Sequence, residues 1–383
     1  MYRPLAESGD LTSFPSYGLS NEARRKCTGL ERSMQSACKV THFSLLFIYG
    51  QHFRLLVVGG GAAGMGASHK FARKLPKFSV AVVEPNENHY YQPGFTMVGG
   101  GWMTVEQNTR REKDLIHPNS VWLHDRVAKF EPKKNMVKLG NGDEITYDYM
   151  ILATGVQLRW DMIKGLPEAF DTPGVTSNYT PLLCPKTNKE LNTVTSGNCV
   201  FTFPNTPIKC AGAPQKVLYY GEEIVRNRGY RDKTNFIYAT SLPRYSLLHI
   251  APPCSTPPAV RECRELTDEK GWVDVDPKTL RYDGYCSCPL VIGKHRAILA
   301  EFNADGQRME TTPLDQSKAR RHPWFMKRYL MPFLYWGFLV KGRWNGPAFI
   351  RSSCIWDLCQ SPSDFKISYS ELCIDKKFIY CIL

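Results

Sequence analysis

The sequence predicts an α/β protein, and three adjacent features lead to this prediction. The apolar run Phe53–Val58 has the composition of a buried strand, and the glycine turn Gly59–Gly64 follows it directly. A helix is predicted at Met65–Lys74, and a second apolar run, Ser79–Glu84, comes next. Strand, turn, helix and strand in this order form a βαβ unit with two parallel strands.

Further elements follow the same α/β pattern. Asn141-Gly142 lies between the predicted strands Val137–Leu139 and Glu144–Tyr147 and indicates a hairpin, because both residues tolerate a positive φ angle. Met150–Ala153 is predicted to be a buried strand that ends at Thr154-Gly155. The other predicted elements are the strands Cys199–Phe203 and Phe236–Ala239 and a helix from Pro214 to Arg228.

Length and composition are those of a folded protein with more than one domain. The chain has 383 residues, of which 43% are hydrophobic and 22% charged, and this excludes an intrinsically disordered chain. The formal net charge of +13 favours an anionic environment. Basic residues are scattered and no nucleic-acid-binding motif accompanies them, so we expect no nucleic-acid partner.

The cysteines and histidines do not predict a metal site. Thirteen cysteines at irregular spacing do not form the framework of a small disulfide-rich protein. Only one residue separates Cys286 from Cys288, which is closer than cysteine ligands of one metal ion usually lie. His89, His117 and His249 match no ligand spacing, and we expect them at the surface or in packing positions.

The glycine turn carries a GxGxxG pattern typical of a Rossmann-like dinucleotide site. Gly59 would make the tight turn, Gly61 would let a pyrophosphate approach, and Gly64 would let helix and strand pack closely. Ala62 and Ala63 would face the pyrophosphate, and Glu84 at the end of the next strand would accept hydrogen bonds from a ribose. The alternative is a glycine turn without a ligand.

Cys210 is a candidate reactive thiol. Lys209 precedes it and Lys216 follows, so a thiolate would gain from nearby positive charge. The small residues Ala211–Ala213 leave space for a cofactor or a sulfur species. An inert loop cysteine is the alternative on local grounds.

Several runs of residues, taken in order, resemble the eukaryotic mitochondrial sulfide:quinone oxidoreductases. The most specific are Phe203–Lys216, around Cys210, and Tyr282–Val291, around Cys288. Others are Glu84-Pro85, Tyr90–Pro93, Leu166–Glu168 and Met331–Trp336, while Thr146–Gly155 resembles the second fingerprint of flavoproteins with two dinucleotide-binding domains. Together these matches cover most of residues 52 to 351.

The resemblance implies an FAD-dependent enzyme that oxidises hydrogen sulfide and reduces ubiquinone. It implies a redox pair of Cys210 and Cys288, with a sulfur acceptor such as glutathione or sulfite. It adds Gln92, Val127 and Gly155 to the cofactor-binding residues. The implied location is the mitochondrial inner membrane, although the acidic residues among the first 51 dilute any transit signal.

Peripheral membrane contact is expected at the aromatic stretch Trp324–Trp344, which has basic residues at its edges. No run reaches the roughly 18 apolar residues of a membrane-spanning helix. A helix packed against the core is the alternative for this stretch.

The sequence predicts five segments. They are an extension (1–51), an FAD-binding Rossmann-like domain (52–165), a truncated second dinucleotide-type domain (166–280), a redox-cysteine and membrane or quinone region (281–351), and an atypical tail (352–383). The family carries extra residues after Leu242, and an aspartate-containing flavin-binding segment between the positions of Leu280 and Arg281. These departures leave two alternatives open, a non-catalytic remnant without FAD and a flavin-dependent NADH:quinone oxidoreductase. The second would need another intact glycine fingerprint.

Overall fold

The computed structural model describes residues 51–204, 206, 208–210, 212–239, 246–274, 286–302, 308–309, 315–344 and 378–380. The side chains of 286–288, 302, 308–309 and 378–380 are not among the described ones. The chain divides into two units, Met1–Gln51 and His52–Leu383. Everything below concerns the second unit and the strand that begins at Gln51.

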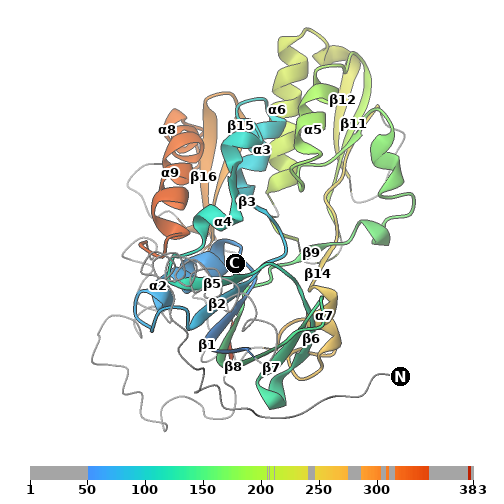
Figure 1. Cartoon of the computed structure of the whole chain (residues 1–383). Coiled ribbons are helices and arrows are strands. Elements are labelled where there is room, and N and C mark those ends of the chain that lie inside the picture. Colours follow the sequence, from blue (N-terminus) through green and yellow to red (C-terminus); the bar gives the residue numbers. More distant parts are fainter. Residues whose placement is uncertain are drawn as a thin grey trace, which may run out of the picture. The chain divides into compact units, whose positions relative to one another are not determined.

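The first sheet contains the predicted βαβ unit (Figure 1). Its strand order is β5-β2-β1-β8-β7-β6, and a further strand, β18, pairs with β8. The bounds are β1 Gln51–Val58, β2 Val80–Val83, β5 Ser120–Leu123, β6 Val127–Glu131, β7 Met136–Leu139, β8 Glu144–Leu152 and β18 Phe378–Tyr380. Strands β1 and β2 are parallel, with Leu55 opposite Val80, as a βαβ unit requires.

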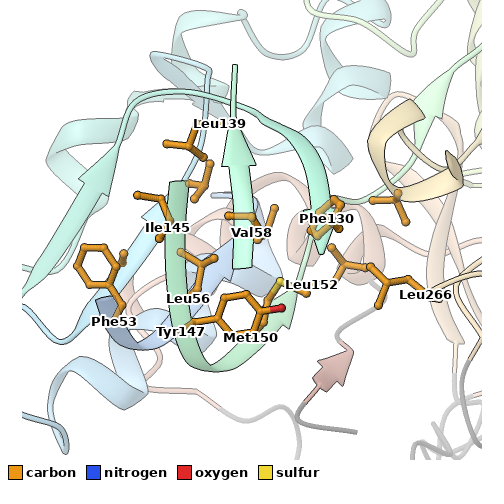
Figure 2. Packing of buried hydrophobic residues seen from close by; sticks show 14 residues of the cluster. Phe53, Leu56, Val58, Phe130, Leu139, Ile145, Tyr147, Met150, Leu152 and Leu266 are labelled. Carbon is orange, nitrogen blue, oxygen red and sulfur yellow. The ribbon is translucent and has the colours of Figure 1, made fainter. Parts of the chain in front are cut away.

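Both faces of strand β1 are covered, which explains its continuous apolar sequence. Leu55 and Val57 pack against the helix α2 (Ala62–Ala72) on one face. Leu56 and Val58 point to the other face, where Phe130, Tyr147 and other residues of β6 to β8 surround them (Figure 2). Leu266, which follows the short helix α7 (Pro258–Glu262), closes this second core.

Three local predictions in this part need correction. The predicted strands Glu144–Tyr147 and Met150–Ala153 are one continuous strand, β8, because Asp148 and Tyr149 stay extended between them. At the hairpin turn only Gly142 has a positive φ, +99°, while the Asn141 side chain accepts a hydrogen bond from the Asp143 N–H at 2.9 Å. Helix α2 begins three residues earlier than predicted, because Gly61 is already its N-cap.

A second, all-parallel sheet has the strand order β10-β13-β11-β12. Its strands are β10 Val175–Thr176, β11 Gly197–Thr202, β12 Thr234–Ala239 and β13 Leu247–His249, and its helices are α5 Cys184–Leu191 and α6 Ala213–Asn227. The core here joins Phe201 and Leu247 of the sheet to Val217 and Tyr220 of α6.

Strand β15 (Cys286–Gly293) opens a third, antiparallel sheet with β16 (Arg296–Phe302) and β17 (Arg308–Met309). A helical segment follows, made of α8 Arg321–Phe325, the π-helical turn η7 Met326–Leu330, α9 Met331–Leu334 and the π-helical turn η8 Tyr335–Leu339. Tyr335 and Val340 pack against Met65 of α2. Within the described residues, no helix is long and apolar enough to cross a bilayer.

The connecting elements are short. They are β3 Asn88–Tyr90, η1 Gln92–Gly94, α3 Phe95–Gly99, η2 Glu106–Asn108, β4 Thr109–Arg111, η3 Pro132–Lys134, α4 Glu112–Leu115, β9 Gln157–Leu158, η4 Trp160–Met162, η5 Glu168–Asp171, η6 Arg231–Lys233 and β14 Cys254–Ser255. Strands β3 and β4 pair antiparallel, which sets His89 opposite Arg110 and leads the chain directly into α4.

Candidate functional site

The glycine turn between β1 and α2 has the geometry predicted for a dinucleotide site. Gly59 has a φ of +106°, and a Cβ atom there would lie 2.3 Å from the carbonyl oxygen of Ala153. A Cβ atom at Gly64 would lie 1.8 Å from the carbonyl oxygen of Gly59, so this residue lets the helix approach the strand. A Cβ atom at Gly61 would meet nothing within 4 Å, which leaves the N-terminus of α2 open to a ligand.

Glu84 closes one side of the turn. Its Oε2 accepts a hydrogen bond from the Gly60 N–H at 2.8 Å, and its Oε1 accepts from the backbone N–H and the side-chain amide of Asn86, at 2.8 and 2.6 Å. These bonds fix the carboxylate beside the turn, where lone pairs that remain can accept from a ribose. Asn86 is a supporting residue that the sequence pattern did not reveal.

A buried chain of three side chains reaches the same turn at Gly60, close to Glu84. Glu112 and His89 are buried, and Glu112 Oε2 lies 3.2 Å from His89 Nδ1. The opposite imidazole nitrogen, Nε2, lies 2.6 Å from the hydroxyl of Tyr335. Burial raises the pKa of Tyr335, so its hydroxyl stays protonated and shares a hydrogen bond with Nε2, while Nδ1 faces the Glu112 carboxylate.

The second oxygen of Glu112 has no hydrogen-bond partner in the described part of the chain. It lies so close to Gly60 that a Cβ atom there would come within 2.1 Å of it. Burial raises the pKa of Glu112, and the hydrogen bond from His89 opposes this shift. An unused polar atom, an open helix N-terminus and a fixed carboxylate therefore meet around one turn, and these groups fit a dinucleotide such as FAD.

The other predicted cofactor residues lie at varying distances from this centre. Ala62 and Ala63 form the first turn of α2, and Gly155, with a φ of +65°, follows strand β8 beside Gly59. Gln92 is exposed and follows Tyr91, which packs near α2. Val127 begins strand β6 and, partly buried, packs against the core that contains Leu56 and Tyr147.

Cys210 lies just before helix α6 and touches a buried ammonium group. Lys216 Nζ is 3.8 Å from Cys210 Sγ, and the Lys216 residue is only 2% exposed. A positive charge at this distance stabilises a thiolate, as does the N-terminus of the 15-residue helix α6. Of the two predicted lysines, Lys216 makes the contact, whereas Lys209 is exposed.

The backbone around Cys210 is held on both sides. The hydroxyl of Tyr179 and the N–H of Ala213 both donate to the carbonyl oxygen of Cys210, each at 3.1 Å. Ile208 and Trp160 pack nearby with Tyr179 and leave the cysteine half-buried. The residue is therefore partly exposed, while its backbone is held in place.

The backbone of Cys288 lies in strand β15, opposite Ala300 of β16, whereas its side chain and that of Cys286 lie outside the described part of the structure. Helix α6 packs against β15. Glu223 of α6 accepts a hydrogen bond from the N–H of Lys294, just beyond the end of β15. Helix α6, which follows Cys210, and strand β15, which contains Cys288, are therefore neighbours.

The two remaining histidines of the sequence prediction are packing residues. His249 is fully buried, accepts a hydrogen bond from the Asn178 N–H at 3.1 Å, and has its pKa lowered to about 3 by burial. Burial also lowers the pKa of His117. His89 is buried as well, and its packing position is part of the hydrogen-bonded chain at the turn. Among the described residues, no three or more ligand-type side chains are arranged to hold a metal ion.

Comparison with known proteins agrees with this geometry. Residues 53–194 match the family of pyridine nucleotide-disulphide oxidoreductases. The structure of a sulfide:quinone oxidoreductase from Aquifex aeolicus superposes with a TM-score of 0.60 at 14% identity, and covers 78% of this chain and 93% of that one, which confirms the fold.

Two curated relatives have the same name. The mitochondrial sulfide:quinone oxidoreductase of Mus musculus is 35% identical over 78% of this chain and 89% of its own length. That of Dictyostelium discoideum is 30% identical over 76% and 87%. The alignment with the mouse protein spans 401 positions, but only about 299 residues of this chain (78% of 383) take part in it. About 100 positions of the alignment are therefore gaps in this chain.

These relatives are FAD-dependent flavoproteins, which confirms the predictions of the enzyme class and of the cofactor. The domain boundaries and the individual site residues stay predictions. The extent and identity of the mouse alignment establish the family, and the chain belongs to the sulfide:quinone oxidoreductases.

Proposed function

We propose that this chain oxidises hydrogen sulfide through a disulfide between Cys210 and Cys288 and transfers the electrons through FAD to ubiquinone. The proposal rests above all on the contact between Cys210 and the buried ammonium of Lys216, at the start of a helix that packs against the strand of Cys288. The names of the relatives support sulfide and a quinone as substrates.

The dimensions of α6 and β15 support a meeting of the two cysteines. Both elements share a contact point where Glu223 meets Gly293 and Lys294. From Glu223 back to Ala213, α6 covers about 15 Å, at about 1.5 Å per residue. From Gly293 back to Cys288, β15 covers about 16 Å, at about 3.3 Å per residue. If the two elements run side by side, Cys288 lies level with the start of α6, where Cys210 is held.

The proposed chemistry uses the two sulfur atoms in separate roles. Hydrosulfide attacks the Cys288 sulfur, the disulfide breaks, and Cys288 becomes a persulfide while Cys210 leaves as a thiolate. Lys216 stabilises that thiolate, which makes Cys210 the better leaving group. An acceptor such as glutathione or sulfite removes the outer sulfur from Cys288, and closing the disulfide again releases two electrons. When bound, FAD supplies the carrier that passes these electrons to ubiquinone.

We place the protein in mitochondria, as the names of the relatives suggest, and specifically at the inner membrane, where ubiquinone is available. The helical segment 321–344 supports peripheral contact because it has two different faces. Trp324 and Tyr335 are buried, whereas Phe325, Tyr329 and Phe333 are 59%, 50% and 62% exposed. A cavity of about 390 Å³ lined by Arg110, Tyr329, Phe333 and other residues opens on the exposed face and gives a quinone ring a place to approach.

The decisive experiment compares three serine variants of the purified protein. Cys210→Ser and Cys288→Ser should each abolish flavin reduction by sulfide, whereas Cys286→Ser should retain most of it, because only the pair supports thiol-disulfide exchange. Peptide mapping without reductant should find Cys210 bridged to Cys288. A bridge from Cys210 to Cys286 would reject the pair, reduction by NADH but not by sulfide would reject the substrate, and a protein that cannot be loaded with FAD would reject the enzyme.

A further inference from the structure

A second site is formed by a strongly basic cavity on the third sheet. The cavity has a volume of about 590 Å³ and lies between the β15–β16 hairpin turn and the chain that leads into α8. Its lining residues are Lys294, His295, Arg296, Ala319, Arg320, Arg321 and His322. Six of these seven residues have basic side chains, and none has a carboxylate.

Backbone hydrogen bonds bring these basic residues together from two stretches of the sequence. Ala297 and Arg320 form an isolated antiparallel bridge, with N–H···O distances of 3.0 and 2.9 Å in the two directions. The ring of His295 packs edge-on against Trp324, with the centroids 4.5 Å apart. His295 also has a φ of +61°, a conformation that is costly for a residue with a side chain. The fold therefore holds the cluster together despite its like charges.

The carboxylates that the structure describes near the cavity do not neutralise it. Among the described residues, none of the six basic side chains takes part in a salt bridge. Glu223 of α6 accepts from the backbone N–H of Lys294, and the carboxylate of Asp315 pairs with Lys318 at 3.0 Å. Glu301 of β16 is buried and bonded to Gln316. Positive charge concentrated in this way attracts an anion.

We propose that this basic cavity binds the phosphate of an anionic lipid headgroup. The lining residues Arg321 and His322 are the first two residues of α8, and the exposed Phe325 follows on the same helix. Tyr329 and Phe333 continue the exposed aromatic surface one and two turns later. Basic side chains beside exposed aromatic ones are the pattern of a surface that binds anionic membranes, the aromatic rings entering the interface while the bases meet the phosphates.

This inference rests on the proposed membrane contact and adds to it a preference for lipid charge. The test uses the FAD-loaded full chain and sedimentation with phosphatidylcholine vesicles, with and without phosphatidylglycerol. The site variant is Arg296→Gln/Arg321→Gln. The control is Lys77→Gln/Lys138→Gln, which removes the same charge from two exposed lysines outside the cavity.

We expect the parent to prefer the vesicles that contain phosphatidylglycerol. The site variant should lose at least about tenfold in affinity for them, since each basic residue near an anionic surface contributes about fivefold. Its binding to neutral vesicles should stay as it is, and the control should change affinity by less than about twofold. Without lipid, the site variant should unfold at the same or a higher temperature, because like charges have been removed.

Four outcomes would overturn the inference. If the site variant and the control lose equal affinity for vesicles that contain phosphatidylglycerol, the preference for anionic lipid comes from the overall charge of the protein. Equal binding of the parent to both kinds of vesicle would leave membrane contact intact but remove the headgroup site, whereas binding to neither would reject membrane contact itself. If inorganic phosphate protects the parent but not the site variant from unfolding, and vesicle charge has no effect, the cavity binds a free anion instead of a lipid.

Discussion

Replacing Gly61 with alanine should separate cofactor binding from folding. Gly61 has a φ of −64° and a ψ of −170°, which any residue can adopt, and its Cβ atom would point into space that is empty for at least 4 Å. Alanine gains about 0.4–1 kcal/mol by restricting the unfolded chain and loses a comparable amount as a poorer N-cap than glycine. The free energy of unfolding without FAD should therefore stay within about 1 kcal/mol of the parent value.

The same methyl group would stand where the pyrophosphate must approach the helix. We expect Gly61→Ala to weaken FAD binding at least tenfold, or by about 1.4 kcal/mol, and the larger Gly61→Val to abolish it. The measurements are FAD titration by flavin fluorescence and thermal unfolding of the flavin-free protein.

Gly64→Ala is the contrasting variant. Its Cβ atom would lie 1.8 Å from the Gly59 carbonyl oxygen, so helix α2 must move, at a cost of about 1–3 kcal/mol or more. It should lose stability as well as flavin, whereas Gly61→Ala should lose flavin alone. If Gly61→Ala binds FAD as tightly as the parent, the pyrophosphate does not lie at this turn and the reasoning fails.

Three further predictions concern buried polar groups. Tyr335→Phe removes the hydrogen-bond partner of the buried His89 imidazole and should lower the free energy of unfolding by about 1–3 kcal/mol in urea titration; an unchanged midpoint would contradict the hydrogen bond. His249 has a pKa of about 3 in the folded protein against 6.5 in the unfolded chain, so between these values only the unfolded chain takes up the proton. The free energy of unfolding should therefore be unaffected by His249 above about pH 6.5 and should fall by about 1.4 kcal/mol per pH unit between about pH 6 and 4. His249→Gln should make this acid slope shallower, as measured by urea unfolding at several pH values, and an identical slope would show that His249 does not titrate this way. Lys216→Met should slow alkylation of Cys210 by iodoacetamide severalfold at neutral pH, whereas Lys209→Met should not, and equal rates in both variants would remove Lys216 from the site.

The first sheet could be predicted from sequence because its signals are local. Strand β1 is apolar at consecutive positions since Leu55 and Leu56 face different cores. Gly59 and Gly64 are needed because a Cβ atom at either position would collide with a backbone carbonyl oxygen. The predictions failed at the ends of helices and strands, where capping residues set the first and last residue of an element. Gly61 begins α2 as its N-cap, and Asn141 uses its side chain instead of a left-handed backbone.

The buried chain at the turn could not be predicted in the same way. His89 contacts Glu112, which is 23 positions later in the chain, and Tyr335, which is 246 positions later. No pattern of nearby residues in the sequence predicts these contacts. The basic cavity was hidden for a related reason. Its charges occur as short runs that look scattered in the sequence, and only the bridge between Ala297 and Arg320 brings them to one place.

The helical segment 321–344 has a structural role that limits how membrane contact can be tested. Deleting it would remove Tyr335 and leave His89 and Glu112 buried with one partner fewer, beside the glycine turn. Such a deletion should loosen the cofactor site as well as any membrane contact, because an unpaired buried group costs about 1–3 kcal/mol. Phe325→Ser/Phe333→Ser changes only the exposed face and leaves the buried chain intact. This variant should therefore bind FAD like the parent while it loses vesicle binding, and parallel loss of both would mean that the exposed rings also support the fold.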